Sequence, residues 1–311
     1  MKLDRLNTLI AALISTTFGL LGVAKPTTAA NLTGLTPNNT LINFDSSNPS
    51  VTTNVKVTGL DANANLLDID YRPANGLLYG LTDTNNIYTI NRDTGAAGLV
   101  STLSTPFSGG VQSGVDFNPR LDRLRVVGSN DQNFSVNVDT GETAVQTPLA
   151  FAAGDPNAGV SPSITAVAYT NSFAGSPDPS RTTQLIDIDY DLNIFAPQLQ
   201  PPNGILITGG SSNFNIPSLL GFDIFFDANG DNIVFTASNS NLFSLNLSNP
   251  QGGVGSETRI GSSDSDISFI GLAAEPIPAP VPEPSSVLGM LTLGAIGAVS
   301  LRKRQKQNVQ P

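Results

Sequence analysis

The sequence predicts an all-β fold, a β-propeller of about five four-stranded blades that is closed by pairing of N- and C-terminal strands. Residues 31–275 show short alternating or apolar runs between Asn, Asp, Gly, Ser and Pro, a pattern typical of many strands and tight turns. The pattern recurs with a period of about 50 residues, and the last period is complete only if both ends of this stretch are joined. A six-bladed ring and a pair of β-sandwiches are the alternative architectures.

The repeat is clearest between residues 67 and 141. Leu67–Pro73 aligns with Ser113–Pro119 at an offset of 46, and the same offset aligns Ile90–Gly95 with Val136–Gly141. Equivalent positions then fall near residues 70, 116, 168, 223 and 273. These steps of 46, 52, 55 and 50 residues suit four short strands joined by tight turns, which is the content of one propeller blade.

Each complete unit is expected to contain four strands. In the first unit these are Leu66–Tyr71, Gly76–Leu81, Asn86–Asn91 and Ala97–Leu103. In the second they are Gly114–Asn118, Arg123–Gly128, Phe134–Val138 and Glu142–Leu149. A third unit begins near Ile164 with an insertion around Ser176–Arg181, and a fourth runs from Leu220 through Asn232–Ala237 and Leu242–Leu247 to Thr258–Ile260.

The fifth unit is divided between the two ends of the domain. Phe269–Ala273 has the pattern of an opening strand, and the other three strands are expected at Leu32–Thr36, Thr40–Phe44 and Val51–Val57. Joining them closes a ring, which hides the edge strands that an open row of sheets would expose.

The N-terminal residues 1–30 form a predicted signal peptide. Lys2 and Arg5 precede an apolar run over Leu6–Ala24, and small residues then lead to a cleavage site after Ala30. This pattern indicates export across the inner membrane, and an uncleaved membrane anchor is the alternative.

The C-terminus has three further segments. Residues 276–286 form a Pro-rich spacer, residues 287–304 an apolar transmembrane helix with a basic end, and residues 305–311 a polar tail. The apolar run is at the short limit for crossing a bilayer, and its basic end is expected on the cytoplasmic side. A permanent membrane anchor would explain the segment as well.

The order of these elements resembles the PEP-CTERM sorting signal, with Pro282, Glu283 and Pro284 before the helix and Arg302, Lys303 and Arg304 after it. The resemblance implies that the export machinery and an exosortase are partners and that the helix inserts only transiently. It also implies a cell-surface or extracellular-matrix location after processing.

The repeat region also resembles a family. The segments Leu78–Asp83, Ile87–Ile90, Asp122–Val127 and Val138–Gly141 are similar to the secreted bacterial domain-of-unknown-function 4394 family, and the likeness extends over residues 32–273. The resemblance implies a propeller-like domain. It supplies no catalytic residue.

The composition excludes several function classes. The chain has no Cys and no His, which removes thiolate nucleophiles, His-based triads and most transition-metal sites. Residues 31–281 carry 8 Lys or Arg and 23 Asp or Glu. Such an acidic surface argues against nucleic acid as a partner.

The repeated triplets Asp93-Thr94-Gly95 and Asp139-Thr140-Gly141 could suggest an aspartic protease. They are 46 residues apart, however, and so occupy equivalent positions of neighbouring units. Asp and Gly there suit a hairpin turn, and we therefore predict two turns and no catalytic residue.

Calcium is the one cofactor that the sequence suggests, at a weak candidate site formed by Asp227, Asn229 and Asp231. Ser238 stands where the distant Glu of a full calcium loop would be, so a hairpin turn is the alternative. Asp187, Asp189 and Asp191 form a second candidate, with a solvated edge strand as its alternative. Arg120, Arg123 and Arg125 are expected either to pair with Asp116 and Asp122 or to form an anion site.

These features favour a non-catalytic exported protein that binds or adheres to a cell-surface polysaccharide or protein through loops at one end of the ring. The alternative is a calcium-dependent propeller hydrolase, similar to a lactonase or esterase. Such an enzyme needs carboxylate or amide oxygens of several blades around a metal and its bound water in the central channel.

Overall fold

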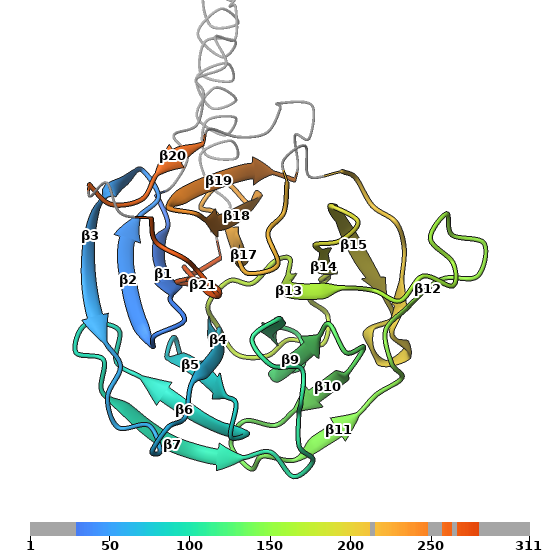
Figure 1. Cartoon of the computed structure of the whole chain (residues 1–311), viewed down its shortest axis with the longest axis horizontal. Helices are drawn as coiled ribbons and strands as arrows, with labels where there is room; N and C mark the ends of the chain where they lie inside the picture. The colour runs from blue at the N-terminus through green and yellow to red at the C-terminus, as the bar shows by residue number, and fades with distance from the viewer. Residues whose placement is uncertain (1–28, 212–214, 248–256, 263–265, 280–311) are drawn as a thin grey trace, which may run out of the picture.

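Five β-sheets surround a central axis in the computed structural model, which describes residues 29–211, 215–247, 257–262 and 266–279 (Figure 1). The strand nearest the axis in each sheet is β21, β4, β8, β13 or β17. The sorting motif and almost the whole predicted signal peptide lie outside the described residues. Within the described part, no helix is long and apolar enough to span a membrane.

Blade 1 is built from both ends of the chain. Its strands, from the axis outward, are β21 (Gly271–Ala274), β1 (Asn31–Leu35), β2 (Thr40–Asp45) and β3 (Asn48–Lys56). β1 pairs antiparallel with β21, so that Thr33 lies opposite Ala273. The predicted closure of the ring is therefore confirmed, and the six-bladed and sandwich alternatives are excluded.

Blades 2 and 3 match the two predicted repeats. Blade 2 contains β4 (Leu66–Tyr71), β5 (Leu78–Thr82), β6 (Asn86–Ile90) and β7 (Ala97–Thr102). Blade 3 contains β8 (Ser113–Asn118), β9 (Arg123–Gly128), β10 (Asn133–Val136) and β11 (Thr143–Val145). β11 is shorter than predicted because the chain after it crosses to the next blade.

Blade 4 has five strands, in the order β13 (Ile164–Tyr169), β14 (Leu185–Asp189), β15 (Ile194–Leu199), β16 (Ile205–Leu206) and β12 (Ala150–Phe151). A short 3₁₀ helix, η1 (Pro201–Asn203), joins β15 to β16. The predicted insertion lies between β13 and β14. Blade 5 contains β17 (Gly221–Phe226), β18 (Asn232–Ser238), β19 (Asn241–Asn246) and β20 (Thr258–Arg259).

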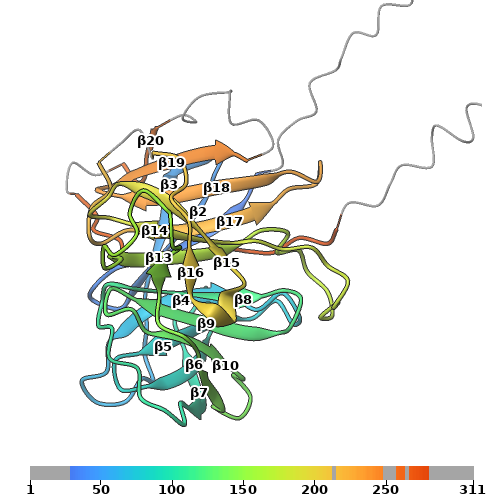
Figure 2. The ribbon, with the colours of Figure 1, turned by 90° about the vertical axis from the view of Figure 1, so that its right-hand side faces the viewer.

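The core consists of apolar layers between adjacent blades. Five clusters of buried side chains each contain residues of two neighbouring sheets, and Figure 2 shows these sheets from the side. Tyr79 of blade 2 and Phe117 of blade 3, for example, meet edge to face at 5.2 Å between ring centroids. Burial of both faces explains why the inner strands are buried along their whole length.

The Asp-Thr-Gly triplets are hairpin turns, as predicted. Gly95 and Gly141 have φ angles of +71° and +74°, and each faces a carbonyl oxygen at the end of the preceding blade, that of Lys56 or Thr102. A β-carbon would collide with that backbone, so glycine is required both by the turn and by the contact between blades.

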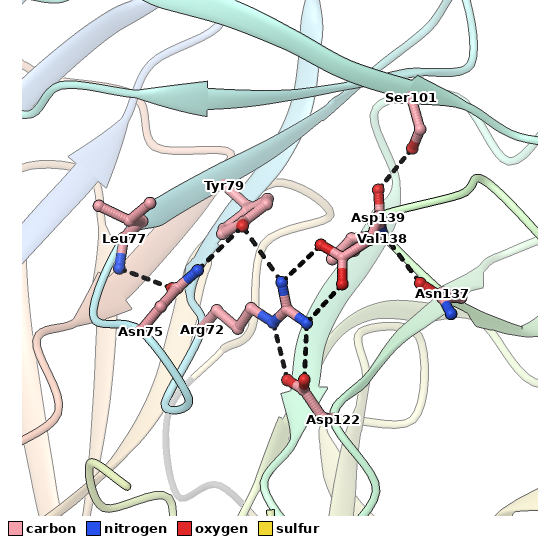
Figure 3. Close-up of polar contacts among 9 residues, drawn as sticks. All are labelled: Arg72, Asn75, Leu77, Tyr79, Ser101, Asp122, Asn137, Val138 and Asp139. Atoms are coloured by element: carbon pink, nitrogen blue, oxygen red, sulfur yellow. Dashed lines mark hydrogen bonds and ion pairs between the residues drawn. The ribbon is translucent and has the colours of Figure 1, made fainter. Parts of the chain in front are cut away.

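Arg72 links blade 2 to blade 3 (Figure 3). Its guanidinium binds Asp122 through Nε and Nη2, at 2.8 and 2.6 Å, and Asp139 through Nη1 and Nη2, at 2.8 and 3.0 Å. The two carboxylates, Asp122 above all, raise the pKa of Arg72 above its usual value. Asp122 therefore pairs with Arg72 and not with Arg120, Arg123 or Arg125.

Replacing Arg72 by methionine should lower the free energy of unfolding by about 2–3 kcal/mol. The loss of a well-paired partner leaves two carboxylates together, and their partial exposure keeps the cost below that of a fully buried pair. The melting temperature should fall by about 5–10 °C for a domain of this size. Asp139→Asn serves as the control, since this side chain is 58% exposed and its loss should cost about 1 kcal/mol or less. Equal effects of the two substitutions would contradict this account.

Candidate functional site

Three of the five inner strands direct an aspartate toward the axis. These residues are Asp70 on β4, Asp116 on β8 and Asp223 on β17, and one carboxylate oxygen of each lies within 4.8 Å of the other two. Their exposed fractions are 5%, 2% and 4%. The two remaining blades carry Ala168 and Ala273 at the equivalent positions of the repeat.

The carboxylates connect neighbouring inner strands. Asp70 accepts a hydrogen bond from the backbone N–H of Phe117 on β8, at 2.8 Å, and Asp223 accepts one from Ala274 on β21, at 2.6 Å. Each also accepts one from the N–H of the next residue in its own strand. The inner strands have no backbone partner on the axial side, so these carboxylates satisfy N–H groups that would otherwise be unpaired.

Asp116 repeats this arrangement with one difference. The backbone N–H of Tyr169 on β13 favours its charged form, and the carboxyl of Asp223 is its close acidic neighbour. Its Oδ1 atom is buried and has no hydrogen-bond donor among the described residues. One acceptor of the axial cluster is therefore unsatisfied.

Burial opposes ionisation of the axial cluster. It raises the pKa of Asp70 and Asp116 well above the usual value, and the neighbouring carboxylates raise both further. The pKa of Asp223 rises to about 6, again chiefly through burial, although the N–H groups of Ala274 and Ile224 act in the opposite direction. The backbone N–H donors therefore favour the ionised form of these carboxyl groups, whereas burial and the neighbouring carboxylates favour the protonated form.

A separate cleft of about 440 Å³ lies between blades 3 and 4. It is lined by parts of β9, β14 and β15, by the turn before β9 and by η1. Many of its side chains are long and polar, among them Arg120, Arg123, Arg125, Gln146, Gln184 and Gln198. Among the described residues, no Asp, Glu or Lys lines this cleft.

Arg125 is the buried cation of this cleft, with an exposed fraction of 5%. Its guanidinium donates to the side-chain oxygens of Asn133 and Gln146 and, at 3.4 Å, to the hydroxyl of Tyr169. All three acceptors are neutral, and no carboxylate of the described residues forms a salt bridge with it. A buried charge is normally paired, so Arg125 has capacity for an anion.

Gln198 provides a second unsatisfied group in the same cleft. It is 2% exposed, and its Nε2 donates to the carbonyl oxygen of Pro201 at 2.9 Å. Its Oε1 is buried and has no donor within the described part of the chain. The cleft therefore offers a cation for an anionic group and an acceptor for a hydroxyl or amide.

Asp187 on β14 lies near Arg125 without pairing with it. The side chain is fully buried, and neither carboxylate oxygen receives a hydrogen bond from the described residues. Burial raises the pKa of Asp187 well above its usual value, although the charge of Arg125 acts in the opposite direction. Asp187 therefore lies close enough to Arg125 for their charges to interact, but within the described residues the two form no salt bridge.

Replacing Asp187 by asparagine should make stability less sensitive to pH. Because the folded-state pKa is raised, the wild-type protein loses stability as pH increases from about 4 through that pKa, whereas the variant cannot ionise. The melting temperature of Asp187→Asn relative to wild type should therefore rise between pH 4 and pH 8. A relative fall over this range would show that Asp187 is ionised and compensates Arg125.

The predicted loop at Asp227 is a hairpin turn between β17 and β18. Asp227 Oδ1 accepts hydrogen bonds from the N–H groups of Asn229 and Asp231, at 2.8 and 2.9 Å, and Gly230 has a φ angle of +87°. Asp231 accepts a hydrogen bond from Asn246. These hydrogen bonds and the positive φ angle are those expected of a hairpin turn. Calcium binding by Asp227, Asn229 and Asp231 stays a prediction.

The surroundings of the second acidic motif, Asp187, Asp189 and Asp191, differ from those that were predicted. β14 is the second strand of blade 4, so the interpretation of Asp187 and Asp189 on a solvated edge strand is wrong. Asp189 instead accepts hydrogen bonds from Asp191 and Leu192 in the turn that follows. An Asp that alternates with apolar residues fits a buried strand as well as an exposed one, and the sequence pattern could not distinguish them.

The comparisons with protein families concern both parts of the chain. The family model described as a domain of unknown function, DUF4394, matches residues 40–273. The chain belongs to the DUF4394 family. The PEP-CTERM protein-sorting motif matches residues 280–305, which include Pro282–Pro284 and Arg302–Arg304. This motif indicates that the DUF4394 domain is exported and processed by an exosortase. A search of curated proteins finds no match.

Three solved structures resemble the DUF4394 chain. A protein of unknown function from Bacteroides caccae has 13% identity and a TM-score of 0.39, with 76% of each chain covered. One from Bacteroides thetaiotaomicron has 15% identity and a TM-score of 0.45, with 78% of this chain and 62% of the other covered. The computationally designed Ika8 protein has 9% identity and a TM-score of 0.35, with 81% and 71% covered. Similarities at this level carry no information on function.

Proposed function

We propose that this protein is a non-catalytic binding protein of the cell surface or extracellular matrix, and that it holds an acidic saccharide in the cleft between blades 3 and 4. The observation that carries the proposal is the buried guanidinium of Arg125, whose partners are all neutral. Nε and Nη1 donate to these neutral partners, which leaves Nη2 to donate a charge-assisted hydrogen bond to a carboxylate oxygen.

The residues of the cleft support binding over catalysis. Its lining contains no carboxylate, and the whole chain has no His or Cys, so the cleft has no evident general base or strong nucleophile. The proposed location outside the cell also suits an acidic saccharide as the ligand. An exosortase-processed protein meets the polysaccharides outside the cell, and the cleft places basic groups locally on an otherwise acidic domain.

The calcium-dependent hydrolase is the second candidate, and the axial carboxylates are the observation in its favour. They converge from three blades, as such an enzyme requires. However, each is at most 5% exposed, and Asp70 and Asp223 accept backbone hydrogen bonds at both oxygens. A substrate would need an open metal position with a bound water, which this buried arrangement does not favour.

Calorimetric titration with a uronic-acid oligosaccharide tests the proposal. A neutral glucan oligosaccharide of equal length is the control ligand. We expect saturable binding of the acidic oligosaccharide only, with an affinity that falls as sodium chloride increases. Equal binding of both ligands, or of neither, would contradict the proposed function. Hydrolysis of a lactone or ester in the same preparation would favour the enzyme.

A further inference from the structure

We propose that the axial cluster of Asp70, Asp116 and Asp223 binds a calcium ion that holds three blades of the ring together. This site is separate from the cleft between blades 3 and 4 and does not depend on the proposed function. It also differs from the calcium candidate at Asp227, which lies in the hairpin between β17 and β18.

The first argument is the unsatisfied oxygen. Asp116 is 2% exposed, and its Oδ1 has no donor in the described structure, while the neighbouring Asp223 is itself an acceptor when ionised. Burial of an unpaired acceptor is costly. A cation at this point would satisfy the oxygen directly.

The second argument is the direction of the N–H groups. Both oxygens of Asp70 and both oxygens of Asp223 accept backbone hydrogen bonds, at distances between 2.5 and 2.8 Å. Short hydrogen bonds of this kind favour carboxylates over carboxylic acids. The fold thus stabilises negative charge on two groups that lie beside a third, and a cation removes the repulsion among them.

The chemistry of the site favours calcium. Its ligands are carboxylate oxygens only, which hard cations prefer and which suit transition metals poorly. Calcium binds oxygens at about 2.3–2.6 Å in a flexible geometry, so it can join oxygens that lie within 4.8 Å of one another. Magnesium needs shorter and more regular contacts. An exported protein meets external calcium, and binding modules in that environment need only weak affinity.

The ion would act on the ring and not on a substrate. Asp70, Asp116 and Asp223 belong to blades 2, 3 and 5, and Asp223 is hydrogen-bonded to β21 of blade 1. The ion would therefore contact three inner strands, β4, β8 and β17. The hydrogen bond from Ala274 to Asp223 would connect it to a fourth, β21. Because all three side chains are buried, we expect the ion to be enclosed and to exchange slowly.

The test measures metal content and melting temperature of the exported protein at constant pH, after EDTA treatment and after addition of calcium. Wild type should bind about one calcium per chain, and at 100 times the dissociation constant its melting temperature should rise by about 5–10 °C. Magnesium at the same concentration should have a smaller effect. Asp116→Asn, which keeps the shape but removes a charge, should reduce the bound calcium at least tenfold and abolish the rise.

Two variants serve as controls. Asp93→Asn removes a carboxylate that is 84% exposed, and Asp227→Asn alters the hairpin between β17 and β18. Both variants should respond to calcium like wild type. If Asp116→Asn were poorly folded, calcium content and response of Asp70→Asn would decide in the same way. The proposal is wrong if wild type binds no calcium, if magnesium acts equally, or if only Asp227→Asn loses the response. None of these outcomes affects binding of a saccharide in the cleft.

Discussion

Replacing Arg125 by glutamine should weaken binding of an acidic oligosaccharide by about 10- to 100-fold. A hydrogen bond to a charged group contributes about 1.5–3 kcal/mol, and each 1.4 kcal/mol changes the affinity tenfold. Arg125 lines the cleft, is almost fully buried and forms no salt bridge with the described residues, so its charge should interact strongly with the ligand. Titration calorimetry of wild type and variant measures the change.

Two further variants make this result specific. Arg125→Lys keeps the charge but loses the planar fork, and its affinity should lie between those of wild type and Arg125→Gln. Arg259→Gln removes a positive charge from β20, on another blade, and should change the affinity less than twofold. The melting temperature of each variant shows whether it is folded. Unchanged affinity in a folded Arg125→Gln variant would mean that the ligand does not bind through this residue.

Deleting the closing strand should abolish folding of the propeller. A chain that ends at residue 268 lacks β21 and with it Phe269, Ile270 and Leu272, which are 1–2% exposed. Loss of three such side chains costs about 8–15 kcal/mol, which matches or exceeds the whole stability of a typical domain. The deletion also leaves the edge of β1 unpaired.

The matched control is a chain that ends at residue 279. It lacks the sorting motif but keeps all five blades, so it should unfold cooperatively on heating, whereas the chain that ends at residue 268 should show no cooperative transition. Circular dichroism during heating distinguishes them. A cooperative transition in both chains would show that the ring is stable without its closing strand.

The fold could be predicted from the sequence because it depends on local and repeated signals. Runs such as Leu66–Tyr71 and Arg123–Gly128 were predicted with the bounds that the structure shows, since turn residues mark both ends of each run. Closure was predictable because one repeat was incomplete at each end of the domain. The short β11 was less predictable, since nothing local signals that the chain then joins another blade.

The candidate sites depend on contacts between distant segments and were harder to find. Residues 70, 116 and 223 are equivalent positions of the repeat, and the aspartate that they share was the available signal, but the strand pattern alone does not show that the three side chains meet. Arg125 was predicted as part of either an anion site or a salt bridge. Its neutral partners Asn133 and Gln146 lie on other segments, so only the three-dimensional structure could show that Arg125 forms no salt bridge with the described residues.

The axial cluster requires a closed five-bladed ring, because Asp223 reaches Ala274 only if β21 lies between blades 5 and 2. The native chain has no cysteine, so a double variant with Thr33→Cys and Ala273→Cys tests closure directly. These residues are opposite partners on β1 and β21, and mild oxidation of the folded protein should form one intramolecular disulfide, detected by mass spectrometry and by mobility on a non-reducing gel. Cysteines at Thr33 and Ala168, which lies on the inner strand of blade 4, should stay reduced. Two free thiols in a folded Thr33→Cys, Ala273→Cys protein would contradict the closed ring.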